Sequence, residues 1–368
     1  MAFLQATGDL NRPYVPSLER IPETQRANFK FRISSPHPRA MWLGHARVFL
    51  QLPRAEGDML EGPIGVLFDP IFSKRCSPVS WVGPKRRLGV PCQVKDLPKV
   101  NVAVIFHDHY ESSLLETIKD IEMFHNAATY YVPKGVKAIL VKFGVSVCRV
   151  NEMGWWDEKL LDEESVGAED SFTILCAKLG QVDYFSETGL SEKDSMENID
   201  VMTVASSISP HRLRVVCTPA QHNSGRSLCK MDKALWATWY LEYTLPDRSL
   251  WRCFFGGDTG YQAQLNGPVC PIFKEIAQRY GPPDLAFLPI AQGSVLPYLS
   301  SILPLSFGVS RLDSAVHCSP SDAIQVHKDI GARNSMPIHW GTWTTEDGAR
   351  TIARELRVGC KREDVRLR

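Results

Sequence analysis

The chain has 368 residues, 44% of them hydrophobic, and carries 42 basic against 41 acidic side chains. This balance excludes a general electrostatic attraction to nucleic acid, and the hydrophobic share suffices for one large domain or two closely packed ones. The sequence contains no run of about 18 apolar residues, so a transmembrane helix is not expected.

Residues 1–38 are rich in proline and polar residues, and they lack the long apolar stretch of a signal peptide. We expect an N-terminal arm there, followed by a domain over residues 39–368. The ten cysteines are scattered and form no CxxC pair. Without a secretion signal they are best interpreted as reduced thiols of an intracellular protein, which predicts a cytoplasmic location.

The first half of the domain alternates β-rich and helical patterns. Apolar and β-branched residues predict strands over residues 47–52, 65–68, 101–106, 127–132 and 145–150. Apolar residues at helical spacing predict helices over 114–124 and 136–143.

An acidic segment interrupts the pattern. Residues 157–170 hold seven acids against one lysine, and the irregular, charged composition continues to about residue 205. Charge blocks of this kind are usually solvated. We therefore expect an insertion or loop at about 157–205, and a functional lid is the alternative.

The alternation resumes at residue 213. Strands are predicted over 214–217, 251–255, 285–290 and 335–338, strand-like patterning covers 235–245, and helices are predicted over 271–279 and 320–330. Several strands end on a polar residue. The sequence therefore predicts a layered α/β fold with its site at the strand ends.

Potential metal ligands share one sequence pattern, an apolar run that stops abruptly at a histidine or aspartate. Zinc favours imidazole nitrogen and carboxylate oxygen, and each occurrence alone is weak evidence, because histidine has many other roles. Together they indicate a metal centre. The candidates are His107 and His109 in VIFHDH, His222 in VVCTPAQH, Asp258 in CFFGGDTG, His339 in SMPIHWG and His317 in SAVHCSP.

These motifs resemble a known family. In chain order, MWLGHARVFLQL, LFDPIFSKRCSPVSWVGPKR, VIFHDHYESSL, TPAQH, FFGGDTGY and MPIHWGT are similar to the metallo-β-lactamase superfamily, and more narrowly to its N-acyl-phosphatidylethanolamine-hydrolysing phospholipase D branch. The likeness covers roughly residues 40–350. It implies a four-layer αββα sandwich of two mixed sheets with metals at one edge.

The resemblance also implies a ligand set. His107, His109, His222 and Asp258 occupy the positions of the family's first metal site. The second metal usually takes an Asp-His pair, shares the bridging aspartate and adds the histidine of IHWG, here His339.

The chain departs from the family at the Asp-His pair, where it carries Glu111 and Ser112. Glu111 still offers a carboxylate, whereas a serine hydroxyl is a poor zinc ligand. We therefore expect one filled zinc site, with a second zinc held by Glu111 and His339 as the alternative; manganese and iron stay open as the metal.

Further roles follow from the same resemblance. Glu111 and Ser112 are expected to face substrate as acid–base or hydrogen-bonding groups, and His317 to transfer protons or bind substrate. Asp69, in LFDP, is expected to accept a hydrogen bond from a ligand imidazole.

Two enzymatic functions are consistent with these observations. One is metal-dependent hydrolysis of a phosphodiester or related lipophilic substrate. The other is non-hydrolytic chemistry of a repurposed single-metal enzyme, such as elimination, isomerisation or decarboxylation of a small molecule, in which a Lewis acid and a base suffice. A third hypothesis is a non-catalytic binding protein that kept the fold, against which the four intact first-site positions argue. We expect a small-molecule or lipid substrate, no nucleic acid and no protein partner. Peripheral contact with an internal membrane is the alternative to a purely cytoplasmic location.

Overall fold

The computed structural model describes residues 26–29, 36–54, 62–75, 85–108, 111–161, 213–224, 233–262, 267–290, 317–344 and 346–367, with the backbone alone at 111–113. Most of the expected N-terminal arm and most of the expected acidic insertion therefore lie outside the described residues. No helix in these ranges is both long and apolar enough to cross a bilayer.

The first half of the domain forms a mixed six-stranded sheet in the order β1-β2-β3-β4-β5-β6. The pairs β1–β2 and β2–β3 are antiparallel, and the other three pairs are parallel. The strands are β1 (Arg39–Gly44), β2 (Arg47–Leu52), β3 (Ile64–Phe68), β4 (Val102–Val104), β5 (Thr129–Pro133) and β6 (Val150–Met153). Strands β2, β3 and β4 are buried throughout, as expected for a sheet covered on both faces.

The second half forms another mixed six-stranded sheet, in the order β12-β11-β10-β9-β8-β7. The pairs from β7 to β10 are antiparallel, and β10–β11 and β11–β12 are parallel. The strands are β7 (Glu158–Leu161), β8 (Leu213–Thr218), β9 (Thr238–Thr244), β10 (Leu250–Phe255), β11 (Leu285–Pro289) and β12 (Ser335–Ile338).

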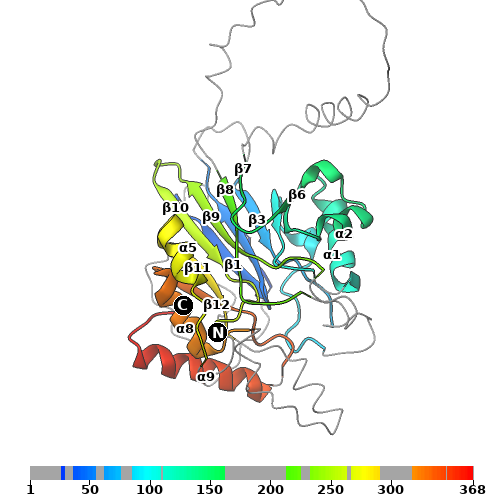
Figure 1. Ribbon diagram of the computed structural model, residues 1–368. Helices are drawn as coiled ribbons and strands as arrows, with labels where there is room; N and C mark the ends of the chain where they lie inside the picture. The colour runs from blue at the N-terminus through cyan, green and yellow to red at the C-terminus, as the bar shows by residue number, and fades with distance from the viewer. Residues whose placement is uncertain are drawn as a thin grey trace, which may run out of the picture.

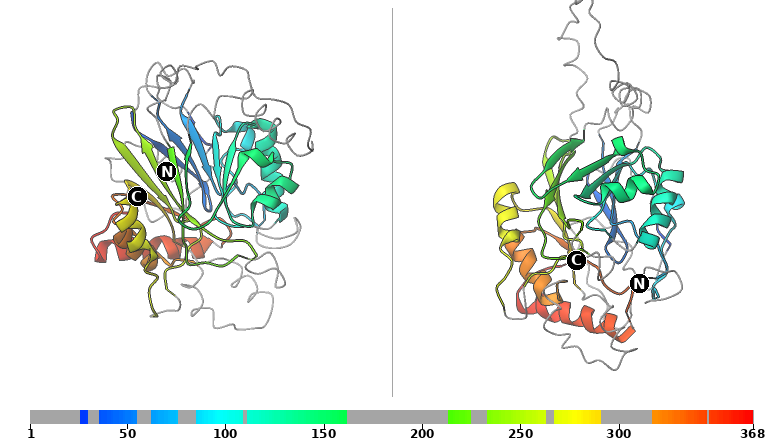
Figure 2. Two further views of the ribbon diagram at one scale, coloured as in Figure 1. Left: turned by 45° about the horizontal axis from the view of Figure 1, so that its top comes forward. Right: turned by 45° about the vertical axis from the view of Figure 1, so that its right-hand side comes forward.

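The two sheets pack face to face (Figures 1 and 2). Side chains alternate across each strand, so that Val48 and Leu50 point into the large core cluster while Phe49 belongs to another cluster. Phe68 stacks on Phe255 of the opposite sheet with ring centroids 4.6 Å apart. Tight packing between the sheets fixes the strand ends relative to one another.

Helices cover the outer faces of the sandwich (Figure 2). Helix α1 (Glu111–Phe124) buries Leu114, Ile118 and Ile121 at i, i+4 and i+7, in one cluster with residues of the first sheet. The remaining helices are α2 (Lys137–Lys142), α5 (Ile272–Tyr280), α8 (Pro320–Ile330) and α9 (Glu346–Arg362), with short 3₁₀ turns η1 (Val94–Asp96) and η2 (Val147–Arg149). The prediction of a four-layer αββα sandwich is confirmed.

Several elements differ from the sequence-based expectations, and strand β1 (Arg39–Gly44) was not predicted. Residues 147–149 form η2, and the strand begins only at Val150. The charged α9 was not predicted. The first residues of the expected acidic insertion form β7, because its charges suit an edge strand: Glu158 accepts a hydrogen bond from Arg214 of β8 at 3.0 Å.

Strand direction determines where the functional side chains gather. Strands β1, β3 and β4 run the same way in the first sheet, and β8, β10 and β12 run the same way in the second. The carboxyl ends of strands that run the same way meet at one edge. The residues that follow these six strands include His45, Asp69, His107, His222, Asp258 and His339.

Candidate metal centre

The loop after β10, residues 256–260, forms the middle of the site. Gly257 has φ +54°, and a Cβ on it would lie 2.0 Å from Cδ2 of Phe106. Only glycine lets the loop approach the end of the first sheet this closely. The approach places Asp258 beside His107, the residue after Phe106.

The same loop is bonded to two other segments that carry histidines. Thr259 Oγ1 accepts a hydrogen bond from the Gln221 amide at 3.1 Å, and the Gly260 amide donates to the Gln221 carbonyl at 2.6 Å. The Cys318 amide donates to the Thr259 carbonyl at 2.9 Å. These bonds hold the neighbours His222 and His317 next to the aspartate loop.

The Asp258 carboxylate lies between two histidines. Its Oδ2 is 3.4 Å from His107 Nε2, and its Oδ1 is 3.3 Å from His339 Nε2. The other imidazoles complete an arc. Ring centroids are 5.0 Å apart for His107 and His222, 5.2 Å for His222 and His317, and 4.8 Å for His317 and His339.

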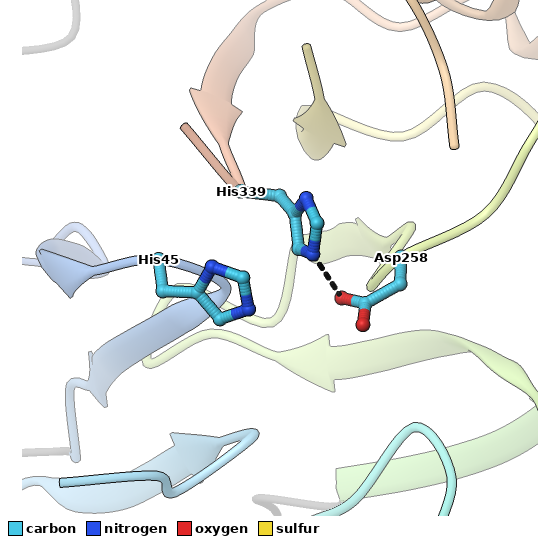
Figure 3. A group of neighbouring side chains, drawn as sticks. All are labelled: His45, Asp258 and His339. Atoms are coloured by element: carbon cyan, nitrogen blue, oxygen red, sulfur yellow. Dashed lines mark ion pairs between the residues drawn. The ribbon is translucent and has the colours of Figure 1, made fainter. Parts of the chain in front are cut away.

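Two groups of donor atoms in and beside this arc could each hold a metal ion. His107, His222 and Asp258 form one group, and His45, Asp258 and His339 form the other, with the donor atoms of each group within 4.8 Å of one another. Figure 3 shows the second group, whose three residues follow three different strands, β1, β10 and β12. Asp258 is 5% exposed, and the partners at ion-pair distance in the described part of the chain are imidazoles alone. A buried carboxylate among imidazoles is a donor set that suits zinc, manganese or iron.

The electrostatics of the apoprotein match this arrangement. Burial alone would raise the pKa of Asp258, but the charge of His339 and the hydrogen bond from His107 outweigh it and hold that pKa well below its ordinary value. Burial, followed by repulsion from His339 and His222, lowers the pKa of His317 well below its ordinary value. At neutral pH Asp258 is therefore ionised and His317 is neutral.

We predict that the metal-free protein loses stability as the pH falls below about 6.5. His317 takes up a proton near that pH when unfolded but only at lower pH when folded, so its contribution to stability is complete above the unfolded pKa. One such proton gives a slope of about 1.4 kcal/mol per pH unit in the free energy of unfolding. Asp258, with a depressed carboxyl pKa, adds a further loss only below about pH 4.

Urea unfolding of chelated protein between pH 7.5 and 5 measures this slope. The variant His317→Asn should show a smaller slope than the wild type. Equal slopes in the two proteins would contradict the assignment of a neutral His317.

Several residues predicted from the sequence come together here, and others cannot be placed. His107, His222, Asp258, His317 and His339 line the arc. His109 lies outside the described residues. Residues 111 and 112 begin α1, and their side chains are not described, so their expected roles stay predictions.

Asp69 shows a contact other than the one expected. Its Oδ1 accepts a hydrogen bond from the backbone amide of Phe106 at 3.1 Å, and its own amide donates to the Val104 carbonyl at 2.8 Å. These bonds fix the end of β4 immediately before His107. The expected hydrogen bond from Asp69 to a ligand imidazole stays a prediction.

His45 was missed by the sequence-based reasoning. It lies between β1 and β2, and its ring centroid is 4.1 Å from that of His339. The segment MWLGH has the same form as the other candidates, an apolar run that stops at a histidine. That signal was available, but the antiparallel pairing that puts the β1 end at the same edge as the β4 end is a long-range feature.

Comparison with known proteins agrees with this fold. Residues 160–340 match the model of a Beta-lactamase superfamily domain. A Caenorhabditis elegans N-acyl-phosphatidylethanolamine-hydrolysing phospholipase D is 29% identical over 311 residues, which is 83% of this chain and 65% of the relative. A Saccharomyces cerevisiae protein of the same name, described as mitochondrial, is 25% identical over 76% of this chain and 44% of the relative. The chain thus spans about two thirds or less of the length of these relatives.

Among solved structures, the diiron β-hydroxylase CmlA from Streptomyces venezuelae superposes with a TM-score of 0.49 at 15% identity, over 89% of this chain and 51% of that one.

Two face-to-face mixed sheets with a cluster of histidines around one aspartate define the fold and its candidate metal centre. The chain matches the Beta-lactamase superfamily domain over residues 160–340 and is similar to N-acyl-phosphatidylethanolamine-hydrolysing phospholipases D.

Proposed function

We propose that this protein is a metal-dependent hydrolase of a phosphodiester, or a related ester, on a lipophilic molecule. One observation carries the proposal: both oxygens of the buried Asp258 face imidazoles, His107 at 3.4 Å and His339 at 3.3 Å. A binding protein without a metal has no evident need for a buried carboxylate surrounded by imidazoles, because polar groups of this kind are costly to bury.

His107, His109, His222 and Asp258 are proposed to hold the first ion, with zinc as the expected metal. When bound, such an ion acts as a Lewis acid on a phosphoryl oxygen and lowers the pKa of water to about 7. The protein residues orient the substrate and manage protons. His317, neutral because its pKa is depressed, is suited to accept a proton at an imidazole nitrogen and return it to the leaving oxygen.

An anionic substrate is favoured by Arg87, which lies beside the loop that follows His339. The Arg87 amide donates to the Thr342 carbonyl at 2.8 Å, and Arg87 Nη2 lies 3.8 Å from the position that a Cβ on Gly341 would take. Within the described residues, Nε and Nη2 of Arg87 are buried and have no hydrogen-bond acceptor. A phosphate oxygen is the acceptor that a guanidinium fork fits best.

We predict that Arg87→Met raises KM for an anionic substrate about 10- to 100-fold with a smaller change in kcat. A hydrogen bond to a charged group is worth about 1.5–3 kcal/mol, and loss of substrate binding affects KM first. Arg333→Met is the matched control, since Arg333 is 72% exposed and pairs with Asp284. Unchanged KM in Arg87→Met would remove this residue from the substrate site.

The reaction is tested with N-acyl phosphatidylethanolamine in mixed micelles. Protein loaded with zinc, manganese or iron should release phosphatidic acid, and chelated protein should not. Absence of turnover with all three metals would contradict the proposed lipid phosphodiesterase activity.

Glu111 and Ser112 favour the second candidate function, the non-hydrolytic single-metal enzyme, because they change the two family positions nearest the chemistry. Under this alternative Glu111 acts as a base on a small molecule. Glu111→Gln would then lose activity while it keeps the first metal. Turnover of phosphodiesters by Glu111→Gln at the wild-type rate would exclude this non-hydrolytic alternative.

The lipid substrate also bears on location. We propose that the protein reaches such a substrate by peripheral contact with a membrane surface, which co-sedimentation with phosphatidylethanolamine vesicles would measure. The cytoplasmic location stays a prediction.

A further inference from the structure

The turn between β1 and β2 is bonded to the loop that carries His339. The His339 amide donates to the His45 carbonyl at 2.8 Å, and the His45 amide donates to Thr342 Oγ1 at 2.8 Å. The Trp42 indole donates to the same His45 carbonyl at 2.6 Å. The bonds to His339 and Thr342 fix the backbone of His45 against the loop after β12, and the Trp42 bond fixes it to β1.

Both histidines have an unusual backbone conformation. His45 has φ +56° and His339 has φ +58°. For residues other than glycine such conformations cost about 1–3 kcal/mol, and they persist where the surrounding structure enforces them, often at functional sites. Here the hydrogen bonds between the two loops enforce them, and the result is that two imidazoles lie together.

The His45 ring lies between His339 and Trp343. Its centroid is 4.1 Å from that of His339 and 4.2 Å from that of Trp343, which it meets edge to face. Figure 3 shows the His45 and His339 rings turned toward the same space beside the Asp258 carboxylate. Packing against Trp343 restricts the ring, so the donor nitrogen is held in place before any ligand arrives.

Each oxygen of the Asp258 carboxylate faces a different set of histidines. Asp258 Oδ2 faces His107, while Oδ1 lies 3.3 Å from His339 Nε2 and has no hydrogen-bond donor within the described residues. One nitrogen from His45, one from His339 and Oδ1 lie within 4.8 Å of one another. Two imidazoles and one carboxylate form a donor set typical of a divalent transition-metal site.

We propose that His45 is a ligand of a second divalent-metal site, which it forms with His339 and Asp258 Oδ1 and which does not require Ser112. The inference rests on the metal-dependent function proposed above, because the two ions share Asp258. It assigns a metal-binding role to the β1–β2 turn, and it predicts two ions per chain.

Metal stoichiometry tests the proposal directly. Full-length protein is stripped with chelator, saturated with Zn²⁺, desalted and measured by elemental analysis. The wild type is expected to hold about two ions and His45→Asn about one. Asparagine is chosen because it tolerates positive φ, and His37→Asn, at an exposed histidine, is the matched control that should hold about two. Two ions in His45→Asn, or only one in the wild type, would overturn the proposal.

A measurement on the wild type alone covers the case in which His45→Asn does not fold. Trypsin releases residues 40–47, AMWLGHAR, in which His45 is the single histidine. Diethyl pyrocarbonate should modify this peptide in chelated protein and in protein with one zinc equivalent, and much less with two. Modification that is independent of zinc would reject His45 as a ligand.

The test of the second metal site can fail or succeed independently of the test of the proposed reaction. If phosphatidic acid is not released but zinc content still falls from two to one in His45→Asn, the reaction is wrong and the second site stands. If lipid is hydrolysed with one ion per chain in the wild type, the reaction stands and the second site falls.

Discussion

Asp258→Asn is expected to release bound metal and to abolish activity. The substitution keeps the size of the side chain but removes the negative charge that faces His107 and His339. Even an outer partner of a metal ligand is worth 10–100-fold in metal affinity or activity, so loss of this central carboxylate should reduce activity by more than about 100-fold. Elemental analysis after desalting, together with the phosphatidic acid assay, measures both effects.

Asp329→Asn provides the matched control. Asp329 accepts a hydrogen bond from the Tyr261 hydroxyl at 3.0 Å and lies near Lys274, with no contact to the imidazole arc among those described. It should keep full metal content. If Asp258→Asn retained metal and activity at the level of this control, the centre would not lie at Asp258.

Gly257→Ala is expected to destabilise the protein and to empty the metal centre together. The new Cβ would lie 2.0 Å from Phe106 Cδ2, so either the loop or the end of β4 must move. Overpacking costs about 1–3 kcal/mol and an alanine in the left-handed region about 1–2 kcal/mol, which gives a loss of about 2–5 kcal/mol. Urea unfolding of the chelated protein measures the loss of stability, and the zinc content of the loaded protein measures the loss of metal.

The variant Gly62→Ala separates the cost of backbone strain from the cost of overpacking. Gly62 has φ +79°, but a Cβ there has no atom within 4 Å. This control should therefore lose about 1–2 kcal/mol from backbone strain alone and keep its zinc. Equal losses of stability and metal in the two variants would show that contact with Phe106 does not position Asp258.

Much of the sandwich could be predicted from local patterns. The strands that precede His222, Asp258 and His339 are apolar runs with an abrupt polar stop, and the structure places all three side chains in one arc. Such runs are detectable because a strand covered on both faces is apolar at nearly every position. The three side chains lie together because their strands run the same way, so that their carboxyl ends meet at one edge of the sheet.

Features that depend on distant partners were not predictable in the same way. Glu158 lies in a strand because Arg214 on β8 offsets its charge, whereas its local sequence is typical of a solvated loop. His45 enters the site because β1 pairs antiparallel with β2, which pairs antiparallel with β3. Helix α9 is rich in charged residues and its apolar face is small: only Ala349 and Gly359 are buried, while Ile352 and Leu356 are partly buried against the core.

Anomalous scattering from crystals of zinc-loaded protein, recorded on both sides of the zinc absorption edge, tests the metal centre most directly. We expect a strong peak at the donor atoms of His107, His222 and Asp258, and a second at those of His45, His339 and Asp258. A loaded, folded protein with no zinc peak at Asp258 would contradict the account.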